Sequence, residues 1–419
     1  MKTLHVFYED QLVGQLLRDA DLVFSFEYAE EWIRSPKSFA LSLAMPLHEK
    51  KFGNRLALSF FENLLPEGEV KENIQRHQHI GGVFDFLAKY GKDCAGAVVV
   101  TEDPAYVRSV DLGKVAAFDI GIVYQALDDK ASVADAIADL NPGYLSLAGA
   151  QDKFPVIIRD GKFFLPTQGA PTTHIVKVPI QHSGIKESVF NEYYCMELAR
   201  AIGLKVPLCR ILAGKYPLFI VDRYDRYTDK QGHVHRLHQQ DLCQAQGFTS
   251  ENKYEDQGGP TLKQNYELIL QHIPVKKRLE SVQAFLDWIG FNLLIGNNDS
   301  HSKNLSLLLT DGSPEIAPLY DLICTAIYPK LKKSFSFAIG EQADFTRLAR
   351  KHLEQLDHQL GLKMGTFSAR LIDLKHRIFM EKDLLASKIM DEHPDASIPE
   401  RISTLIADRD KSLKMQGVS

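Results

Sequence analysis

Two acids and one amide occur in the order that phosphoryl transfer requires. Asp299 and Asn304 are separated by four residues within the polar loop 296–304, and a second acid, Asp321, follows the next strand and turn. In such a reaction one carboxylate receives the proton of the acceptor hydroxyl, while an amide and another carboxylate hold Mg²⁺ against the phosphates. Because Mg²⁺ keeps several waters, these two protein oxygens are enough. Ordinary turns use the same residue types, so the loop alone leaves a structural role open.

A lysine interrupts an apolar strand upstream of this loop. Lys177 lies in the expected strand 174–178, where a buried ammonium group needs an anion. A strand lysine paired with a helix glutamate is how kinases hold nucleotide phosphates, and Glu192 on the following helix is the expected partner. Glu187 and Glu197 are alternative partners, and an edge-strand lysine that points to water is the plain alternative.

Two further segments complete a kinase-like order along the chain. The small residues of 146–153 have backbone amides that can wrap phosphate oxygens, although they match no standard glycine-rich motif and also suit a hairpin turn. Residues 221–225 fall where a kinase has its hinge, and Tyr224 is expected either beside adenine or in the core. Within the catalytic loop, Lys303 is expected to neutralise phosphoryl charge and His301 to contact phosphate or ribose.

Hydrophobic patterns indicate the elements that must position these residues. Alternation over residues 1 to about 50 predicts a small antiparallel sheet, and Asp160-Gly161 predicts a hairpin. A helix is expected over Ser188–Ile202, and a strand over Phe335–Ile339. The stretch from 104 to about 140 has little pattern and is expected to link two parts of the chain. Amphipathic helices are expected over Leu348–Lys411.

The composition is that of an ordinary globular protein. The chain has 419 residues, 45% of them hydrophobic and 25% charged, which suggests two or three subdomains. A net charge of −5 argues against a dedicated nucleic-acid binder. The five cysteines include no Cys-x-x-Cys pair and are expected to be reduced core thiols. With no apolar run long enough to cross a membrane and no signal-peptide stretch, a cytoplasmic location is expected.

Taken together, these motifs resemble those of the HipA family, the serine/threonine kinase toxins of bacterial toxin–antitoxin modules. The resemblance covers nearly the whole chain and rests on the segments Ser146–Lys153, His174–Lys177, Asn298–Leu305 and Tyr320-Asp321. It implies an α+β, protein-kinase-like two-lobe fold with a β-rich N-terminal lobe and an all-helical C-terminal lobe. The expected parts are an N-terminal β-rich subdomain over 1–105, a nucleotide-binding part over 106–240, and a helical lobe with the catalytic loop over 241–419.

The resemblance also implies a role for each site residue. Asp299 is expected to be the catalytic base, Asn304 and Asp321 the Mg²⁺ ligands, and Ser146 the site of an inactivating autophosphorylation. Glu192 remains the expected partner of Lys177. The residues expected to bind ATP are Ala148, Gly149, Ala150, Gln151, Lys153, Lys177, Asp222, Tyr224, Asp225, His301, Lys303 and Tyr320.

The implied partners are a small helix-turn-helix antitoxin of the HipB type, operator DNA held through that antitoxin, and a protein substrate. For known members the substrate is an aminoacyl-tRNA synthetase, typically the glutamyl enzyme, whose modification stalls translation and leads to dormancy and persistence. Tyr320-Asp321-Leu322 stands where ordinary protein kinases have Asp-Phe-Gly, so an ordinary activation-loop mechanism is not implied. A small-molecule or lipid kinase and a non-catalytic corepressor are the alternatives.

Overall fold

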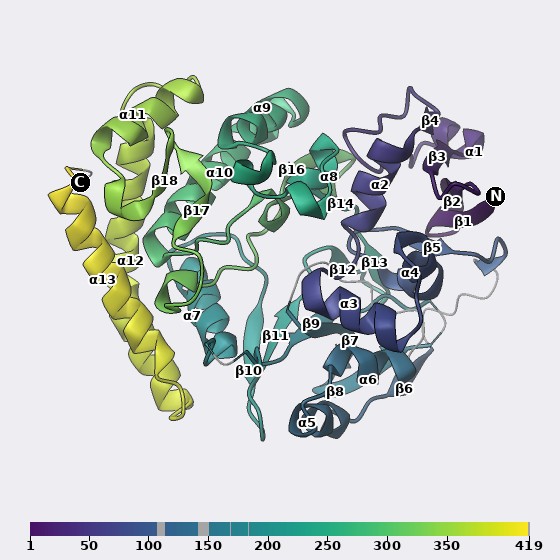
Figure 1. The fold of residues 1–419 in the computed structure, drawn as a ribbon, viewed down its shortest axis with the longest axis horizontal. Helices are drawn as coiled ribbons and strands as arrows, with labels where there is room; N and C mark the ends of the chain where they lie inside the picture. Colours follow the sequence, from purple (N-terminus) through teal and green to yellow (C-terminus); the bar gives the residue numbers. More distant parts are fainter. Residues whose placement is uncertain (107–113, 141–150, 168, 183, 418–419) are drawn as a thin grey trace. The chain divides into compact units, whose positions relative to one another are not determined.

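The computed structural model describes residues 1–106, 114–140, 151–167, 169–182 and 184–417. They form two compact units, each assembled from separate stretches of the chain (Figure 1). Unit 1 comprises Met1–Val178, Ala213–Glu251 and Leu307–Gly312, and unit 2 comprises Pro179–Leu212, Asn252–Ser306 and Ser313–Ser419.

The first sheet of unit 1 is the predicted N-terminal antiparallel sheet. Its strand order is β4-β3-β2-β1-β5. Glu9, with φ +49°, turns the chain between β1 and β2. The last strand, β5, has three residues, and all three pair with β1. The strands are β1 (Lys2–Tyr8), β2 (Gln11–Arg18), β3 (Phe24–Tyr28), β4 (Lys51–Phe52) and β5 (Val99–Thr101).

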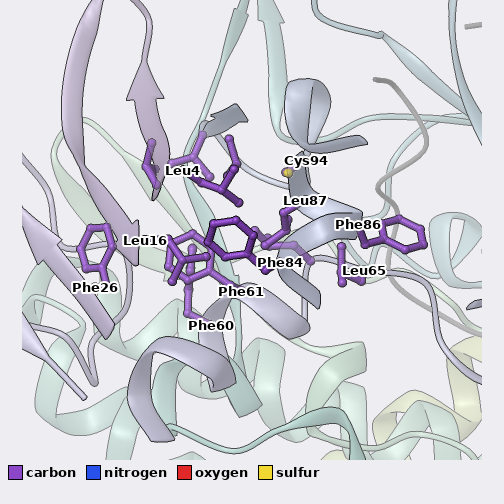
Figure 2. Packing of buried hydrophobic residues seen from close by; sticks show 14 of the residues in the cluster. Leu4, Leu16, Phe26, Phe60, Phe61, Leu65, Phe84, Phe86, Leu87 and Cys94 are labelled. Carbon is purple, nitrogen blue, oxygen red and sulfur yellow. The ribbon is translucent and has the colours of Figure 1, made fainter. Parts of the chain in front are cut away.

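Helices pack their apolar faces on this sheet and close its core. Leu4 and Leu16 from the strands meet Phe60, Phe61 and aromatic residues of α4, and all of them are buried (Figure 2). Each buried side chain of this size contributes about 1.5–3 kcal/mol by leaving water, so the cluster holds strands and helices together. The helices are α1 (Glu30–Arg34), α2 (Asn54–Glu62), α3 (Gly68–His77) and α4 (Val83–Tyr90).

The second sheet of unit 1 carries the predicted nucleotide-binding strands. Within this unit the order is β11-β9-β7-β8-β6, with antiparallel pairing throughout. Asp160 and Gly161 both have positive φ, as a tight two-residue hairpin requires, which confirms that prediction. The strands are β6 (Val115–Ala117), β7 (Lys153–Arg159), β8 (Lys162–Pro166), β9 (His174–Lys177) and β11 (Leu218–Asp222).

The expectation of an unpatterned link from 104 to about 140 is wrong for its described part. Residues 115–140 form β6, α5 (Gly121–Asp128) and α6 (Val133–Leu140). Both helices are only eight residues long, too short to show several apolar repeats in the sequence. Asp152 caps α6, because its carboxylate accepts the N–H groups of Val133 and Ala134.

The rest of unit 1 follows β11. Strand β14 begins at Gln239 and ends at Asp241. His238 directly precedes it, and its carbonyl accepts the N–H of Leu309 in β15 at 2.8 Å. Asp241 caps the next helix together with Gln244, each side chain binding the other's backbone N–H. The elements are β12 (Arg226–Thr228), β13 (Val234–Arg236), β14 (Gln239–Asp241), α8 (Leu242–Gln246) and β15 (Ser306–Thr310), whose first residue belongs to unit 2.

Unit 2 is mainly helical. Helix α12 packs against α7, α10, α11 and α13, and α13 also packs against α7 and α10. The helices are α7 (Ser188–Ala201), α9 (Leu262–His272), α10 (Val275–Ile295), α11 (Arg350–Gln359), α12 (Thr366–Glu392) and α13 (Ile398–Met415), which confirms the helices predicted over Ser188–Ile202 and Leu348–Lys411. The strands are β10 (Cys209–Leu212), β16 (Ser313–Ile316), β17 (Ser334–Ile339), which was predicted, and β18 (Gln342–Asp344).

Candidate active site

The catalytic-loop segment begins where the buried helix α10 ends. Gly296 has φ +77°, and its N–H and that of Asn297 both donate to the carbonyl of Asn292, at 3.1 and 2.9 Å. A glycine in this left-handed conformation is a common helix stop. The side chains of the loop therefore leave from a fixed point at the end of a rigid helix.

Asp299 is the accessible member of an otherwise buried loop. Its side chain is 52% exposed, whereas His301, Lys303 and Asn304 are buried. The amide Nδ2 of Asn304 donates to the carbonyl of Asp299 at 3.0 Å. Because that bond fixes the amide group, the Oδ1 of Asn304 faces away from this carbonyl.

Asn297 connects Asp299 to Asp321. Its Oδ1 accepts the N–H of Asp299 at 3.1 Å, and its Nδ2 donates to Asn292 Oδ1 at 2.9 Å and to the carbonyl of Asp321 at 3.4 Å. Asp321 itself has φ +57°, a conformation that few residues other than glycine adopt. Such backbone strain clusters at functional sites, where surrounding contacts maintain it.

Further hydrogen bonds hold the loop from two other sides. The N–H of Asn298 donates to Thr325 Oγ1 at 2.7 Å, and its carbonyl accepts from Ser336 Oγ at 2.8 Å. On the other side, Asn265 of α9 donates to Ser302 Oγ at 3.0 Å. These bonds fix the loop whose geometry sets the position of Asp299.

The loop residues expected to bind ATP lie around the same segment. Lys303 belongs to a 3₁₀ turn, η5 (Ser302–Asn304), and its carbonyl accepts from Tyr320 Oη at 2.6 Å. His301 Nε2 lies 4.0 Å from Asp299 Oδ1. Unit 2 thus brings Asp299, His301 and the backbone of Lys303 into one segment and connects Asp321 to it.

Unit 1 places two of the predicted phosphate-binding lysines beside each other. Lys153 and Lys177 are direct partners across the β7–β9 pair, so their side chains leave the same face of the sheet. Lys177 is buried and Lys153 is partly buried. Two like charges so placed repel each other unless anionic groups lie near them, and a nucleotide polyphosphate supplies several negative charges.

Three other residues that were predicted to bind ATP lie at or near the ends of strands in the same sheet. Asp222 Oδ1 lies 3.2 Å from His174 Nε2, and the two residues are cross-strand partners. Tyr224 Oη donates to Gln239 Oε1. Gln151 Nε2 donates to the carbonyl of Val178 at 3.0 Å, next to the end of β9.

Asp225 differs from the other predicted ATP-binding residues because its carboxylate is used inside unit 1. Its oxygens accept from Arg223 Nε and Nη2 at 3.0 and 2.9 Å and from the N–H of Gly96 at 2.6 Å. Burial alone would raise the pKa of Asp225, but Arg223 and Arg226 outweigh it and the pKa lies below its usual range. These contacts are those of a structural ion network.

Some predicted residues can be located only in part. Ser146, Ala148, Gly149 and Ala150 lie outside the described residues. Glu192 is buried in α7 of unit 2. Its pairing with Lys177, which belongs to unit 1, stays a prediction.

The donor set suits Mg²⁺. Among the described residues, no group of three or more His, Cys, Asp and Glu side chains is arranged to hold a metal ion. An amide and a carboxylate oxygen, as on Asn304 and Asp321, are hard ligands of the kind that Mg²⁺ binds together with substrate phosphates. The residues present therefore fit this ion.

Two residues of the site were not assigned a role from the sequence. Asn297 was visible as part of the polar loop, and its place directly after a helix-ending glycine was a usable signal. Tyr254, whose hydroxyl lies 2.7 Å from Asp299 Oδ1, is 45 positions earlier in an irregular segment. Nothing in the local sequence pointed to it.

Models of two protein families match the chain. The HipA N-terminal domain matches residues 4–101, and the HipA-like C-terminal domain matches residues 145–381. The chain is 35% identical to the putative kinase Y4mE of Sinorhizobium fredii, over 89% of each chain. It is 30% identical to the serine/threonine-protein kinase toxin HipA of Shewanella oneidensis, over 90% of this chain and 87% of that protein.

A solved structure agrees over almost the whole chain. It is the Shewanella oneidensis HipA in a complex with HipB and operator DNA, with a TM-score of 0.83 and 26% identity, and the match covers 98% of this chain and 97% of that one. The predicted α+β, kinase-like fold with a β-rich N-terminal and a helical C-terminal lobe is thereby confirmed. The helical lobe also contains the β17–β18 hairpin.

No helix in the described part of the chain has the length and apolar character that a membrane span needs. The chain belongs to the HipA family of serine/threonine-protein kinase toxins.

Proposed function

We propose that this kinase transfers the γ-phosphoryl group of ATP to a serine or threonine of a protein and acts as the toxin of a toxin–antitoxin module. The observation that carries the proposal is the exposed carboxylate of Asp299 on a buried loop, with the Asn304 amide fixed beside it. A base must be reachable by its substrate and must not move.

In the proposed reaction Asp299 accepts the proton of the acceptor hydroxyl. The acceptor oxygen then forms a bond to the γ-phosphorus, while the bond from that phosphorus to the bridging oxygen breaks and ADP leaves. Lys153 and Lys177 offset phosphate charge, and Asn304 and Asp321 would hold Mg²⁺, which supplies charge neutralisation at the phosphates. Asp222 and Tyr224 would border the adenine ring.

The proposed antitoxin is supported by a relative, and the proposed substrate rests on the family resemblance. The Shewanella HipA was solved with HipB and operator DNA, which supports a HipB-like antitoxin and an operator complex for this chain. We extend the family resemblance to the substrate, an aminoacyl-tRNA synthetase of the glutamyl type in the cytoplasm. Its phosphorylation would stall translation and promote dormancy.

Ser146 is the proposed site of self-inactivation. A phosphoserine adds about two negative charges beside residues meant to bind ATP phosphates, and like-charge repulsion would oppose nucleotide binding. Mass spectrometry of the intact protein after incubation with Mg-ATP should show one added phosphate in the wild type and none in Ser146→Ala. Equal self-phosphorylation of both proteins would remove Ser146 from the proposal.

The catalytic role is tested with Asp299→Asn, which keeps the size of the side chain and removes the base. Phosphate transfer from labelled ATP to purified glutamyl-tRNA synthetase should fall by at least about a hundredfold, the usual contribution of general base catalysis. Expression of the variant should no longer arrest growth. Growth arrest that persists would favour the non-catalytic corepressor, and transfer to a lipid or sugar panel in place of the synthetase would favour a small-molecule kinase.

A further inference from the structure

A tyrosine hydroxyl lies at the proposed catalytic base. Tyr254 Oη donates to Asp299 Oδ1 at 2.7 Å, and both residues belong to unit 2. A base takes a proton from a hydroxyl at about 2.6–3.2 Å. The phenol of Tyr254 therefore has the donor geometry that an acceptor serine or threonine would need at this carboxylate.

Contacts of the two residues that follow Tyr254 hold the segment that carries it. Tyr254 directly precedes a 3₁₀ turn, η4 (Glu255–Gln257), and its ring meets that of His301 edge-on at 5.1 Å. The carboxylate of Glu255 accepts the N–H of Ala338 in β17 at 2.9 Å. Asp256 pairs with Lys332 at 2.6 Å. The placement of the phenol is thus fixed by contacts other than its own hydrogen bond.

Two cations lie near the ring of Tyr254. The ammonium groups of Lys253 and Lys332 lie 5.3 and 5.4 Å from the centre of the ring. A hydrogen bond to an ionised carboxylate is roughly twice as strong as one between neutral groups.

We propose that Tyr254 determines which acceptors reach Asp299, an inference that rests on the proposed kinase function. In the resting enzyme the phenol occupies Asp299 Oδ1, the oxygen that would otherwise accept a proton from water. A protein acceptor gains binding free energy from contacts remote from its hydroxyl, and this free energy displaces the phenol. Water has no remote contacts. The enzyme therefore hydrolyses little ATP while no protein acceptor is bound.

Acceptor-independent ATP hydrolysis tests this inference. The full-length protein with Mg-ATP and no added acceptor is assayed, as wild type and as Tyr254→Phe, for initial ADP release in excess of the phosphate incorporated into the protein itself. The variant should release ADP about tenfold faster, the effect of removing one hydrogen bond to a charged group. Tyr216→Phe is the matched control, because Tyr216 donates to Asp128 at 2.9 Å with a lysine near its ring, and it should stay within about twofold of wild type. A phenol that only orients the base would instead give slower ADP release in Tyr254→Phe, and this or an unchanged rate would overturn the inference.

A second readout separates this inference from the proposed function. Phosphate transfer to dephosphorylated casein, divided by ADP released, should fall in Tyr254→Phe because more ATP is lost to water. Tyr254→Leu, which removes the whole ring, should show the same trend, and thermal melting reports whether each variant folds. A wild type that turns over no ATP would contradict the kinase function itself. A wild type that turns over ATP, with the same ratio in both Tyr254 variants, would contradict only the role of Tyr254.

Discussion

Asn297 is the residue that couples the proposed base to the proposed metal ligand. Its buried amide accepts from the N–H of Asp299 and donates toward the carbonyl of Asp321. Asn297→Ala should lower kcat by at least about tenfold and the free energy of unfolding by about 1–3 kcal/mol, because buried backbone groups lose their partner. Steady-state kinetics and chemical denaturation give the two values.

The control for this prediction is Asn63→Ala in unit 1. The Asn63 amide is also buried and donates to the carbonyls of Ser59 and Phe248, at 2.6 and 2.8 Å. It should lose comparable stability and keep its kcat. Equal kcat losses in both variants would mean that general destabilisation, and not the coupling through Asn297, explains the result.

Residues differ in how far the sequence could reveal them. Asp299, Asn304 and Asp321 were recognisable because their chemistry depends on local spacing and order. Tyr254 could not be found, since its contact with Asp299 arises from folding over 45 positions. Asp225 lies in the same short segment as Asp222 and Tyr224, and all three were predicted to bind ATP. Only the structure shows that the carboxylate of Asp225 binds two arginines.

At the scale of elements, helix α13 supports the end of α10. Arg409 of α13 donates from Nε and Nη2 to the carbonyl of Leu293, at 3.1 and 2.7 Å, in the last turn of α10. Its guanidinium lies 3.5 Å from the centre of the Phe345 ring, and burial lowers its pKa to about 10. A cation at the C-terminus of a helix also interacts favourably with the helix dipole.

Arg409→Met should therefore destabilise the protein by about 2–4 kcal/mol, since it removes two donors and a cation while it keeps an apolar chain. The midpoint of thermal unfolding measures the loss. Arg401→Met, on the exposed surface of the same helix, should change it little. If the two variants melt alike, the contact with Leu293 contributes no net stability.

Elements with a strong local signal were predicted best. Asp160-Gly161 determines its hairpin through two positive φ angles, and the long helices α12 and α13 have many apolar repeats. Helices α5 and α6 were missed because each has only about two turns. The N-terminus of α6 has one local cap, Ser132, whose hydroxyl accepts the N–H of Asp135 at 3.2 Å, and one distant cap, Asp152, which the sequence could not reveal.

At the scale of the whole molecule, a buried ion network ties distant stretches of unit 1 together. Asp93 pairs with Arg223, Arg226 and Arg236, at 3.1, 3.0 and 3.0 Å, and also accepts from Thr172. These partners are between 79 and 143 positions away from Asp93. No periodicity or motif in a single sequence encodes such pairing, so the network could not be predicted.

This network should make the protein sensitive to acid. Burial alone would raise the pKa of Asp93, but the three guanidinium groups outweigh it and hold the pKa well below its usual range. A depressed folded-state pKa means that the stabilisation is present above the unfolded pKa of about 3.9 and is lost as the pH falls toward the folded value. Stability measured by urea denaturation should therefore begin to fall below about pH 5 and continue to fall through about pH 3 and lower.

Asp93→Asn tests the origin of that slope. At pH 7 the variant should be less stable by about 3–5 kcal/mol, because it leaves three arginines, two of them buried, with too little negative charge. Below pH 5 the wild type should lose more stability than the variant, since the variant no longer has this carboxylate to protonate. Asp395→Asn, at an exposed position, should follow the wild-type curve. Parallel curves for wild type and Asp93→Asn would show that other carboxylates cause the acid sensitivity and that the Asp93 network does not.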